Sequence, residues 1–162
     1  MTFYKRPAVT VDAAIYRIKN SEIEVLVVKR KNDPFKGYYA FCGGFVDYGE
    51  DPKDAVLREL KEETNLDGKN PILFDVRGAP DRDPRGHTIS IFYSVEMVDP
   101  NQEPKGGDDA AEAMFVPLST VLGLNFDKDL NAVINSQTLP MAFDHLNGFK
   151  SFYTWLKKEN LI

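Results

Sequence analysis

The feature that most constrains the fold of this chain is one amphipathic segment, Pro52 to Thr64, with a helix signal at each end. Asp51 is a good N-cap, and Pro52 suits the first helical position, where its missing N–H costs nothing. Asn65 tolerates a left-handed backbone and so predicts where the helix ends. The positions that share one helical face are Val56, Leu57, Leu60 and Thr64. The segment therefore predicts a helix that buries one side.

Segments typical of β-strands surround this helix. The stretches Ala8 to Ile18 and Ile23 to Val28 are rich in β-branched residues, and Lys19-Asn20-Ser21 suits a hairpin between them. Further strands are expected at Ile72 to Gly78, Thr88 to Val98 and Ala113 to Val116, and tail helices at Phe126 to Ser136 and Phe143 to Leu156. Mixed strands around one central helix favour an α/β sandwich of a single domain over residues 1–162.

Composition excludes several classes of function. Twenty Lys and Arg residues face twenty-five Asp and Glu residues, and a net charge of −5 disfavours general binding to nucleic acid or anionic membranes. The single Cys42 cannot form an internal disulfide. No apolar run approaches the ~20 residues of a membrane span, and the N-terminus lacks the apolar core of a signal peptide. We expect a soluble cytoplasmic protein.

The run Arg58-Glu59-Leu60-Lys61-Glu62-Glu63 carries a concentration of acids on one helical face. Like charges at this spacing repel, and a divalent cation such as Mg²⁺ or Mn²⁺ would convert the repulsion into attraction. The alternative is a solvated acidic face. The preceding loop, Gly43 to Glu50, favours a ligand site because its paired glycines let backbone approach a bound group closely.

This region resembles the Nudix box, the signature of Nudix hydrolases. Gly44 is followed after five residues by Glu50 and after seven more by the run Arg58 to Leu66, so the box spans residues 44–66. Asn65 stands where the family pattern has Gly. Cys42 stands where many members carry Pro, and we expect a small buried filler there, with a reactive thiol as the alternative.

The resemblance implies an α/β/α sandwich with a mixed sheet, in which the box forms a loop–helix–loop. It also implies metal-dependent hydrolysis of a nucleoside diphosphate linked to another group. By position, Glu59 and Glu63 would be the main metal ligands, Glu62 a further ligand or organiser, and Arg58 the residue that orients them. The carbonyl of Gly44 would complete the coordination of Mg²⁺, with Mn²⁺ as the alternative metal.

The segment Gly78 to His87 is the expected source of substrate contacts. Two arginines on a rigid loop suit bidentate binding of phosphate or ribose, and a charged hairpin turn with internal Asp–Arg pairs is the alternative. The residues assigned to the substrate are Gly44, Arg82, Asp83, Arg85 and His87. The segments 82–87, 107–110 and 143–145 resemble the ADP-ribose pyrophosphatase branch, which implies conversion of ADP-ribose to AMP and ribose 5-phosphate.

Several assignments stay open in the sequence. The general base is expected among Asp108, Asp109 and Glu112, with Glu112 favoured because it lies where the loop meets a strand. His87 and His145 are either ligand contacts or structural hydrogen bonders. The same features resemble Nudix-like regulators that bind ADP-ribose without catalysis. NADH, a nucleotide sugar or a dinucleoside polyphosphate is the alternative substrate, and a homodimer is the alternative to a monomer.

Overall fold

The computed structural model describes residues 3–107, 110–126, 132–134 and 139–162. Its strands and helices, in chain order, are β1 (Ala8–Ala14), β2 (Tyr16–Lys19), β3 (Glu22–Arg30), β4 (Tyr39–Ala40), β5 (Cys42–Phe45), α1 (Pro52–Thr64), β6 (Gly68–Arg77), β7 (Thr88–Met97), β8 (Ala110–Pro117), α2 (Leu118–Leu122), β9 (Leu124–Phe126), β10 (Ala132–Ile134) and α3 (His145–Lys158). Within the described residues, no helix is both long and apolar enough to cross a membrane.

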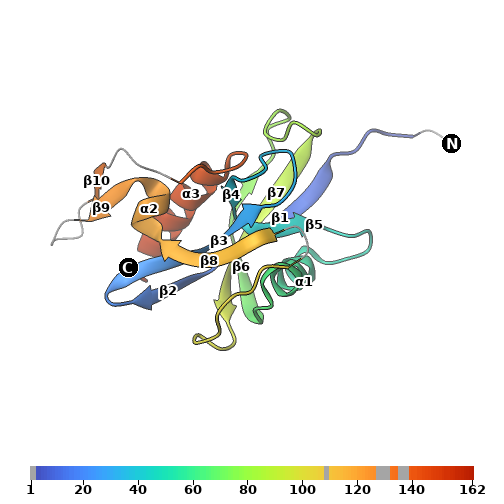
Figure 1. Cartoon of the computed structure of the whole chain (residues 1–162). Coiled ribbons are helices and arrows are strands. Elements are labelled where there is room, and N and C mark those ends of the chain that lie inside the picture. The colour runs from blue at the N-terminus through green and yellow to red at the C-terminus, as the bar shows by residue number, and fades with distance from the viewer. Residues whose placement is uncertain (1–2, 108–109, 127–131, 135–138) are drawn as a thin grey trace.

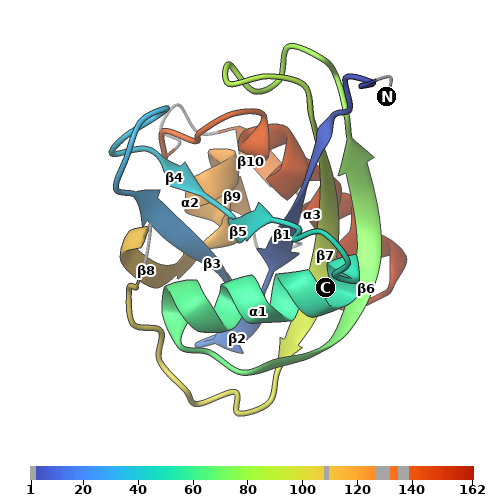
Figure 2. The same ribbon diagram turned by 90° about the vertical axis from the view of Figure 1, so that its right-hand side faces the viewer.

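A mixed sheet lies at the centre of the molecule. Its strand order is β5-β1-β7-β6, with β1 parallel to β7 and the other neighbours antiparallel. A second sheet joins β2, β3 and β4, and β8 pairs with β3. Helix α1 covers one face, while α2 and α3 lie on the opposite side (Figures 1 and 2). This arrangement is the expected α/β/α sandwich with a mixed sheet.

The core has two halves because strand residues point alternately to opposite faces of the sheet. Toward α1, the buried side chains of Val11 and Val95 join Leu60 in one cluster. Toward α3, Phe92 and Phe149 belong to the other cluster. Full burial of one such side chain stabilises the fold by about 1.5–3 kcal/mol. The two clusters hold the helices on the sheet and fix where their ends lie.

The far end of α3 carries the only tryptophan of the sequence, Trp155. Its ring lies parallel to that of Phe152, with 5.9 Å between centroids and 13° between planes. Its ring centroid also lies 6.3 Å from that of Phe74 on β6. Aromatic packing therefore attaches α3 to the sheet at the end opposite the helix start.

Both ends of the central helix form as the sequence predicts. The side chain of Asp51 accepts the backbone N–H of Lys53 at 2.8 Å, which makes it a true N-cap. Asn65 has a φ of 61°, and its N–H donates to the carbonyl of Lys61. The predicted bounds, Pro52 to Thr64, are confirmed.

One predicted helix is wrong where the structure describes it. The stretch Phe126 to Ser136 was expected to be helical, but Phe126 ends β9 and residues 132–134 form β10, paired antiparallel with it. Residues 127–131 and 135–136 of this prediction lie outside the described residues. Gly123, at a φ of 65°, ends α2 just before β9, and Val133 and Ile134 are β-branched residues that favour strands. The second tail helix is confirmed as α3, two residues later than expected.

Candidate active site

The two glycines before α1 allow a close approach that no side chain would permit. A Cβ at Gly44 would lie 2.4 Å from Oε1 of Glu59, and one at Gly43 would lie 2.1 Å from the carbonyl oxygen of Val11. Strand β5 can therefore pass directly over the carboxylate of Glu59. This contact brings the backbone of Gly44 to the acids of α1.

Arg58 organises the acids at this junction. Its Nε and Nη2 donate to the two carboxylate oxygens of Glu50 at 2.7 and 2.9 Å. Its Nη1 donates to Glu59 at 2.9 Å and to Glu62 at 3.2 Å, and its Nη2 also donates to the carbonyl of Phe45 at 3.1 Å. Hydrogen bonds from Arg58 lower the pKa of Glu50 to about 2. One guanidinium thus holds three carboxylates in place.

Glu63 differs from the other acids because it is buried. It is 7% exposed, and its Oε2 accepts the backbone N–H of Gly43 at 3.2 Å. Burial, together with the negative charges of Glu59 and Asp12, raises the pKa of Glu63 to about 8, although hydrogen bonds from Cys42 and the Gly43 N–H act in the opposite direction. A cation beside Glu63 would stabilise its ionised form.

These acids fit a magnesium ion that shares its coordination with substrate. Among the residues that the structure describes, no three His, Cys, Asp or Glu side chains gather into a ready-made metal cage. Mg²⁺ is usually held by one or two carboxylates, with waters and substrate phosphates as the remaining ligands. Glu59 and Glu63 are the candidates for such a pair because their side chains are the less exposed, whereas that of Glu62 is 42% exposed; Glu59 and Glu62 both accept from Arg58.

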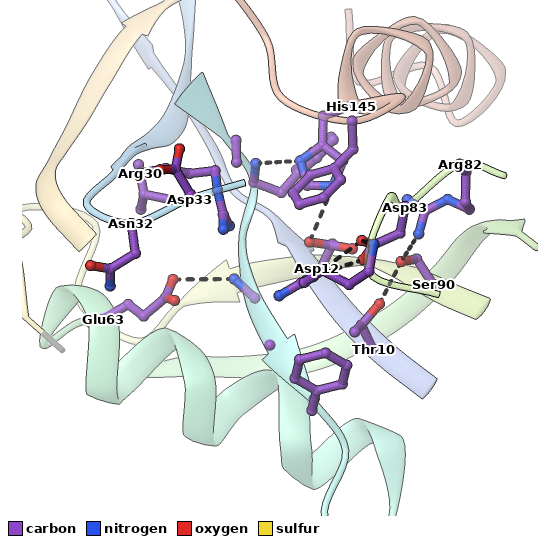
Figure 3. A pocket seen from close by; sticks show the side chains of 18 residues that line it. Thr10, Asp12, Arg30, Asn32, Asp33, Glu63, Arg82, Asp83, Ser90 and His145 are labelled. Carbon is purple, nitrogen blue, oxygen red and sulfur yellow. Dashed lines mark hydrogen bonds and ion pairs between the residues drawn. The ribbon is translucent and has the colours of Figure 1, made fainter. Parts of the chain in front are cut away.

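A polar cavity of about 240 Å³ opens beside Glu63. Figure 3 shows its labelled side chains, which come from β1, β3, the loop after β3, α1, the loop before β7, β7 and the start of α3. Asp12 and Ser90 lie on its floor, and Thr10 shares a hydrogen bond with Ser90. Strand β1 is otherwise apolar and is interrupted by two polar residues, Thr10 and Asp12. That interruption is the sequence signal that could have identified this part of the cavity.

The segment 78–87 places its two arginines in different environments. The side chain of Arg82 is 4% exposed and forms hydrogen bonds to Asp144 and Ser90. The side chain of Arg85 is 42% exposed, and its Nη2 pairs with Asp83 at 2.8 Å. Both arginines and Asp83 line the cavity. The internal Arg85–Asp83 pair anticipated for a charged turn is therefore present in a loop that also faces the cavity.

The two histidines also differ in position. His145 lines the cavity, where its Nδ1 accepts the N–H of Phe41 at 3.1 Å and its Nε2 lies 3.8 Å from Oδ1 of Asp12. Burial lowers the pKa of His145 to about 3, so the ring is neutral at pH 7. Burial raises the pKa of Asp12 to about 7. His87 is exposed, with Nε2 2.9 Å from the carbonyl oxygen of Gly78, and is absent from the cavity lining.

The residues suggested as general base are only partly described. Glu112 lies on β8, exposed and opposite Lys29 of β3, and it is not among the residues lining the cavity. Asp108 and Asp109 lie outside the described residues. The chain just before them reaches α1, because a Cβ at Gly107 would lie 2.6 Å from the carbonyl oxygen of Glu62. This loop therefore approaches the helix at the residues proposed to bind metal.

Cys42 is a buried filler, as expected. Its Sγ lies 3.7 Å from the carbonyl oxygen of Glu59, and burial raises the pKa of the thiol well above its ordinary value. Phe41 is also buried, with its ring stacked on Phe149 at 3.8 Å. The side chains of both residues belong to the core.

Comparison with known proteins gives a family match over most of the chain. The model of the NUDIX domain matches residues 6–136. An ADP-ribose pyrophosphatase of Methanocaldococcus jannaschii is 47% identical over 126 residues, covering 78% of this chain and 71% of the relative. An ADPR responsive transcriptional repressor, NtrR, of Acinetobacter baylyi is 37% identical over 157 residues, covering 94% of this chain and 59% of the repressor.

A solved structure shows the same architecture with a bound ligand. The NUDIX domain of Shewanella oneidensis NrtR, solved with ADP ribose, superposes with a TM-score of 0.78 at 28% identity, covering 94% of this chain and 90% of that one. The family match extends well beyond the box at residues 44–66.

Proposed function

We propose that this chain, which belongs to the Nudix hydrolases, hydrolyses the pyrophosphate bond of ADP-ribose. The products are AMP and ribose 5-phosphate, and the metal is Mg²⁺. The observation that carries the proposal is the junction of α1 and β5, where Arg58 holds Glu50, Glu59 and Glu62 beside a polar cavity. The similarity to an ADP-ribose pyrophosphatase over 78% of the chain supports this substrate.

In the proposed reaction, Glu59 and Glu63 would hold the metal, with the Gly44 carbonyl as a further protein ligand. Bound Mg²⁺ would neutralise the pyrophosphate oxygens and lower the pKa of a coordinated water. Arg58 and Glu62 keep the carboxylates oriented. In the proposed substrate complex, Arg85 binds a phosphate or ribose oxygen.

The covalent change is one substitution at phosphorus. The oxygen of water forms a bond to one phosphorus, and the bond from that phosphorus to the bridging oxygen breaks. A general base takes the proton of the attacking water, and the bridging oxygen leaves with the second phosphate. We propose Glu112, Asp108 and Asp109 as the candidates for this base, and of these the position of Glu112 on β8 is the one the structure describes.

A sensing function is the second candidate. It is supported by the 37% identity to an ADPR responsive repressor over 94% of this chain, although the chain spans 59% of that protein. In this case the same cavity would bind ADP-ribose without cleaving it. The acids that would bind metal, Glu59 and Glu63, are both present and favour the enzyme.

The test is a product assay with a substrate panel. Purified chain is incubated with Mg²⁺ and ADP-ribose, NADH, a nucleotide sugar or a dinucleoside polyphosphate, and the products are separated by chromatography, with EDTA as the metal-free control. We expect AMP and ribose 5-phosphate, with the highest kcat/KM for ADP-ribose. A higher kcat/KM for another compound would contradict the substrate. No turnover, together with a rise in Tm on adding ADP-ribose, would identify a sensor.

A further inference from the structure

Asp144 occupies the N-cap position of α3 but makes no capping hydrogen bond with its side chain. Both of its carboxylate oxygens instead accept from Arg82, at 2.6 Å from Nη2 and 2.9 Å from Nε. An Asp at this position ordinarily stabilises a helix by accepting a backbone N–H of the first turn. Helix α3 therefore lacks this capping hydrogen bond, and the carboxylate instead binds Arg82, which lies 62 positions earlier in the chain.

Arg82 is fixed by this contact on the cavity wall. Its Nη1 donates to Ser90 Oγ at 2.8 Å, and its side chain is 4% exposed. Asp144 takes the Nε–Nη2 edge of the Arg82 guanidinium and Ser90 takes its Nη1, so neither of its two edges can bind a phosphate with two parallel hydrogen bonds. Arg82 therefore anchors its loop to α3 and to β7. Arg85 also gives its Nε–Nη2 edge to a carboxylate, Asp83, and it differs from Arg82 in its greater exposure.

Arg85, three residues later, faces the cavity with its side chain 42% exposed. Its guanidinium carbon lies 5.2 Å from the ring centroid of Phe45 and 5.5 Å from that of Phe143. Phe143 directly precedes Asp144 and has a φ of 53°, an unusual backbone conformation for a bulky residue. The segment that holds Arg82 thus also supplies one of the two rings against which Arg85 packs.

We propose that Asp144 is a positioning residue for substrate binding: through Arg82 it fixes the loop of residues 79–86, so that Arg85 faces the cavity. This inference rests on the proposed function, because it assumes that Arg85 binds the substrate. The competing explanation is that the Asp144–Arg82 pair only stabilises the fold. The two explanations differ in whether the effect of Asp144 depends on Arg85.

A double-mutant cycle separates them. We expect Asp144→Asn to raise KM for ADP-ribose about tenfold with kcat nearly unchanged, because the loop no longer presents Arg85. Arg85→Ala should raise KM by a similar factor, and the double variant should raise it no further than Arg85→Ala alone. Multiplied effects in the double variant would overturn the proposal, because Asp144 would then act independently of Arg85.

A second measurement needs neither turnover nor ligand. Trypsin cleaves after arginine, and the bond between Arg85 and Gly86 lies in this loop. We expect Asp144→Asn to be cut after Arg85 several-fold faster than the wild type, since a released loop fits a protease more readily. An unchanged rate would contradict the positioning role. If the wild type turns over no compound, the proposed function fails, while the cleavage rate still decides whether Asp144 holds the loop.

Two further variants keep the test decisive. Asp144→Glu retains the charge but displaces the carboxylate by one methylene, and it replaces Asp144→Asn if that variant does not fold. Asp75→Asn is the matched control, because it breaks an Asp–Arg pair of 2.9 Å to Arg77 on β6, away from the cavity. We expect this control to leave KM and cleavage after Arg85 unchanged. A change of similar size in the control would show that any lost ion pair has the same effect, and would overturn the proposal.

Discussion

The two sides of the cavity use charge in opposite ways. On the α1 side, Arg58 is 28% exposed and its four carboxylate partners, which include Asp47 at 3.7 Å, outnumber it, so negative charge remains for a cation to neutralise. On the α3 side, Arg82 is 4% exposed and matched by Asp144, and His145 is buried and neutral. An excess of negative charge favours binding of a catalytic metal, whereas paired, buried polar groups favour a rigid surface for substrate binding. We therefore expect changes on the α1 side to alter kcat and changes on the α3 side to alter KM.

The largest expected effect comes from Glu63→Gln. Loss of a proposed metal ligand should lower kcat by about 10²–10³-fold, because charge developing on the phosphates is no longer neutralised. The fold should persist, since the amide oxygen of Gln can still accept the N–H of Gly43 and the neutral group lacks the cost of a buried charge. Steady-state kinetics and thermal melting measure both quantities.

The control for this variant is Glu22→Gln, an exposed glutamate on β3 that does not line the cavity. Its kcat should equal that of the wild type. Near-normal turnover of Glu63→Gln with Mg²⁺ would show that the metal assignment on the α1 side is wrong.

Arg85→Ala should have a smaller effect of a different kind. Removing one cationic contact to the substrate should raise KM about tenfold and change kcat by less than threefold. Initial rates over a range of ADP-ribose concentrations give both constants. A fall in kcat with unchanged KM would contradict the assignment of Arg85 to substrate binding.

The smallest effect concerns stability in the absence of metal. The pKa of Glu63 is raised to about 8 and that of Asp12 to about 7, so the folded chain keeps these protons after the unfolded chain has released them. The free energy of unfolding therefore falls as pH rises from 6.5 to 8. His145 contributes little to this change, because its pKa is about 3 in the folded chain and about 6.5 in the unfolded chain. We expect Tm in EDTA to drop by about 4 °C over this range.

In Glu63→Gln this pH-dependent drop should be smaller than in the wild type, since one of the two acids no longer titrates. An equal drop in both proteins would assign the effect to other groups. A rise of Tm with pH would contradict the sign of both pKa shifts.

The α1 side was predictable from sequence because its contacts are local. Arg58 lies eight residues from Glu50, one from Glu59 and four from Glu62, so a single helix and the loop before it bring them together. The caps of α1 depend on adjacent residues in the same way, and the helix bounds were predicted correctly.

The α3 side was less predictable because its contacts join distant segments. His145 meets Phe41 across 104 residues, and Asp144 meets Arg82 across 62. The sequence indicated that Arg82 and Arg85 belong to one functional loop, but not that only Arg85 leaves its guanidinium substantially exposed. Asp144 would be expected from local rules to cap α3, and the tertiary ion pair overrides that preference.

The stacking of Trp155 on Phe152 has a practical consequence for spectroscopy. With a single tryptophan in the sequence, intrinsic fluorescence excited at the indole reports on α3 alone. The fluorophore lies at the opposite end of this helix from Asp144, outside the residues that line the cavity, so a nucleotide added as titrant does not contact the indole. A change in its emission would therefore record movement of the helix. Fluorescence can thus monitor whether α3 remains packed against the sheet.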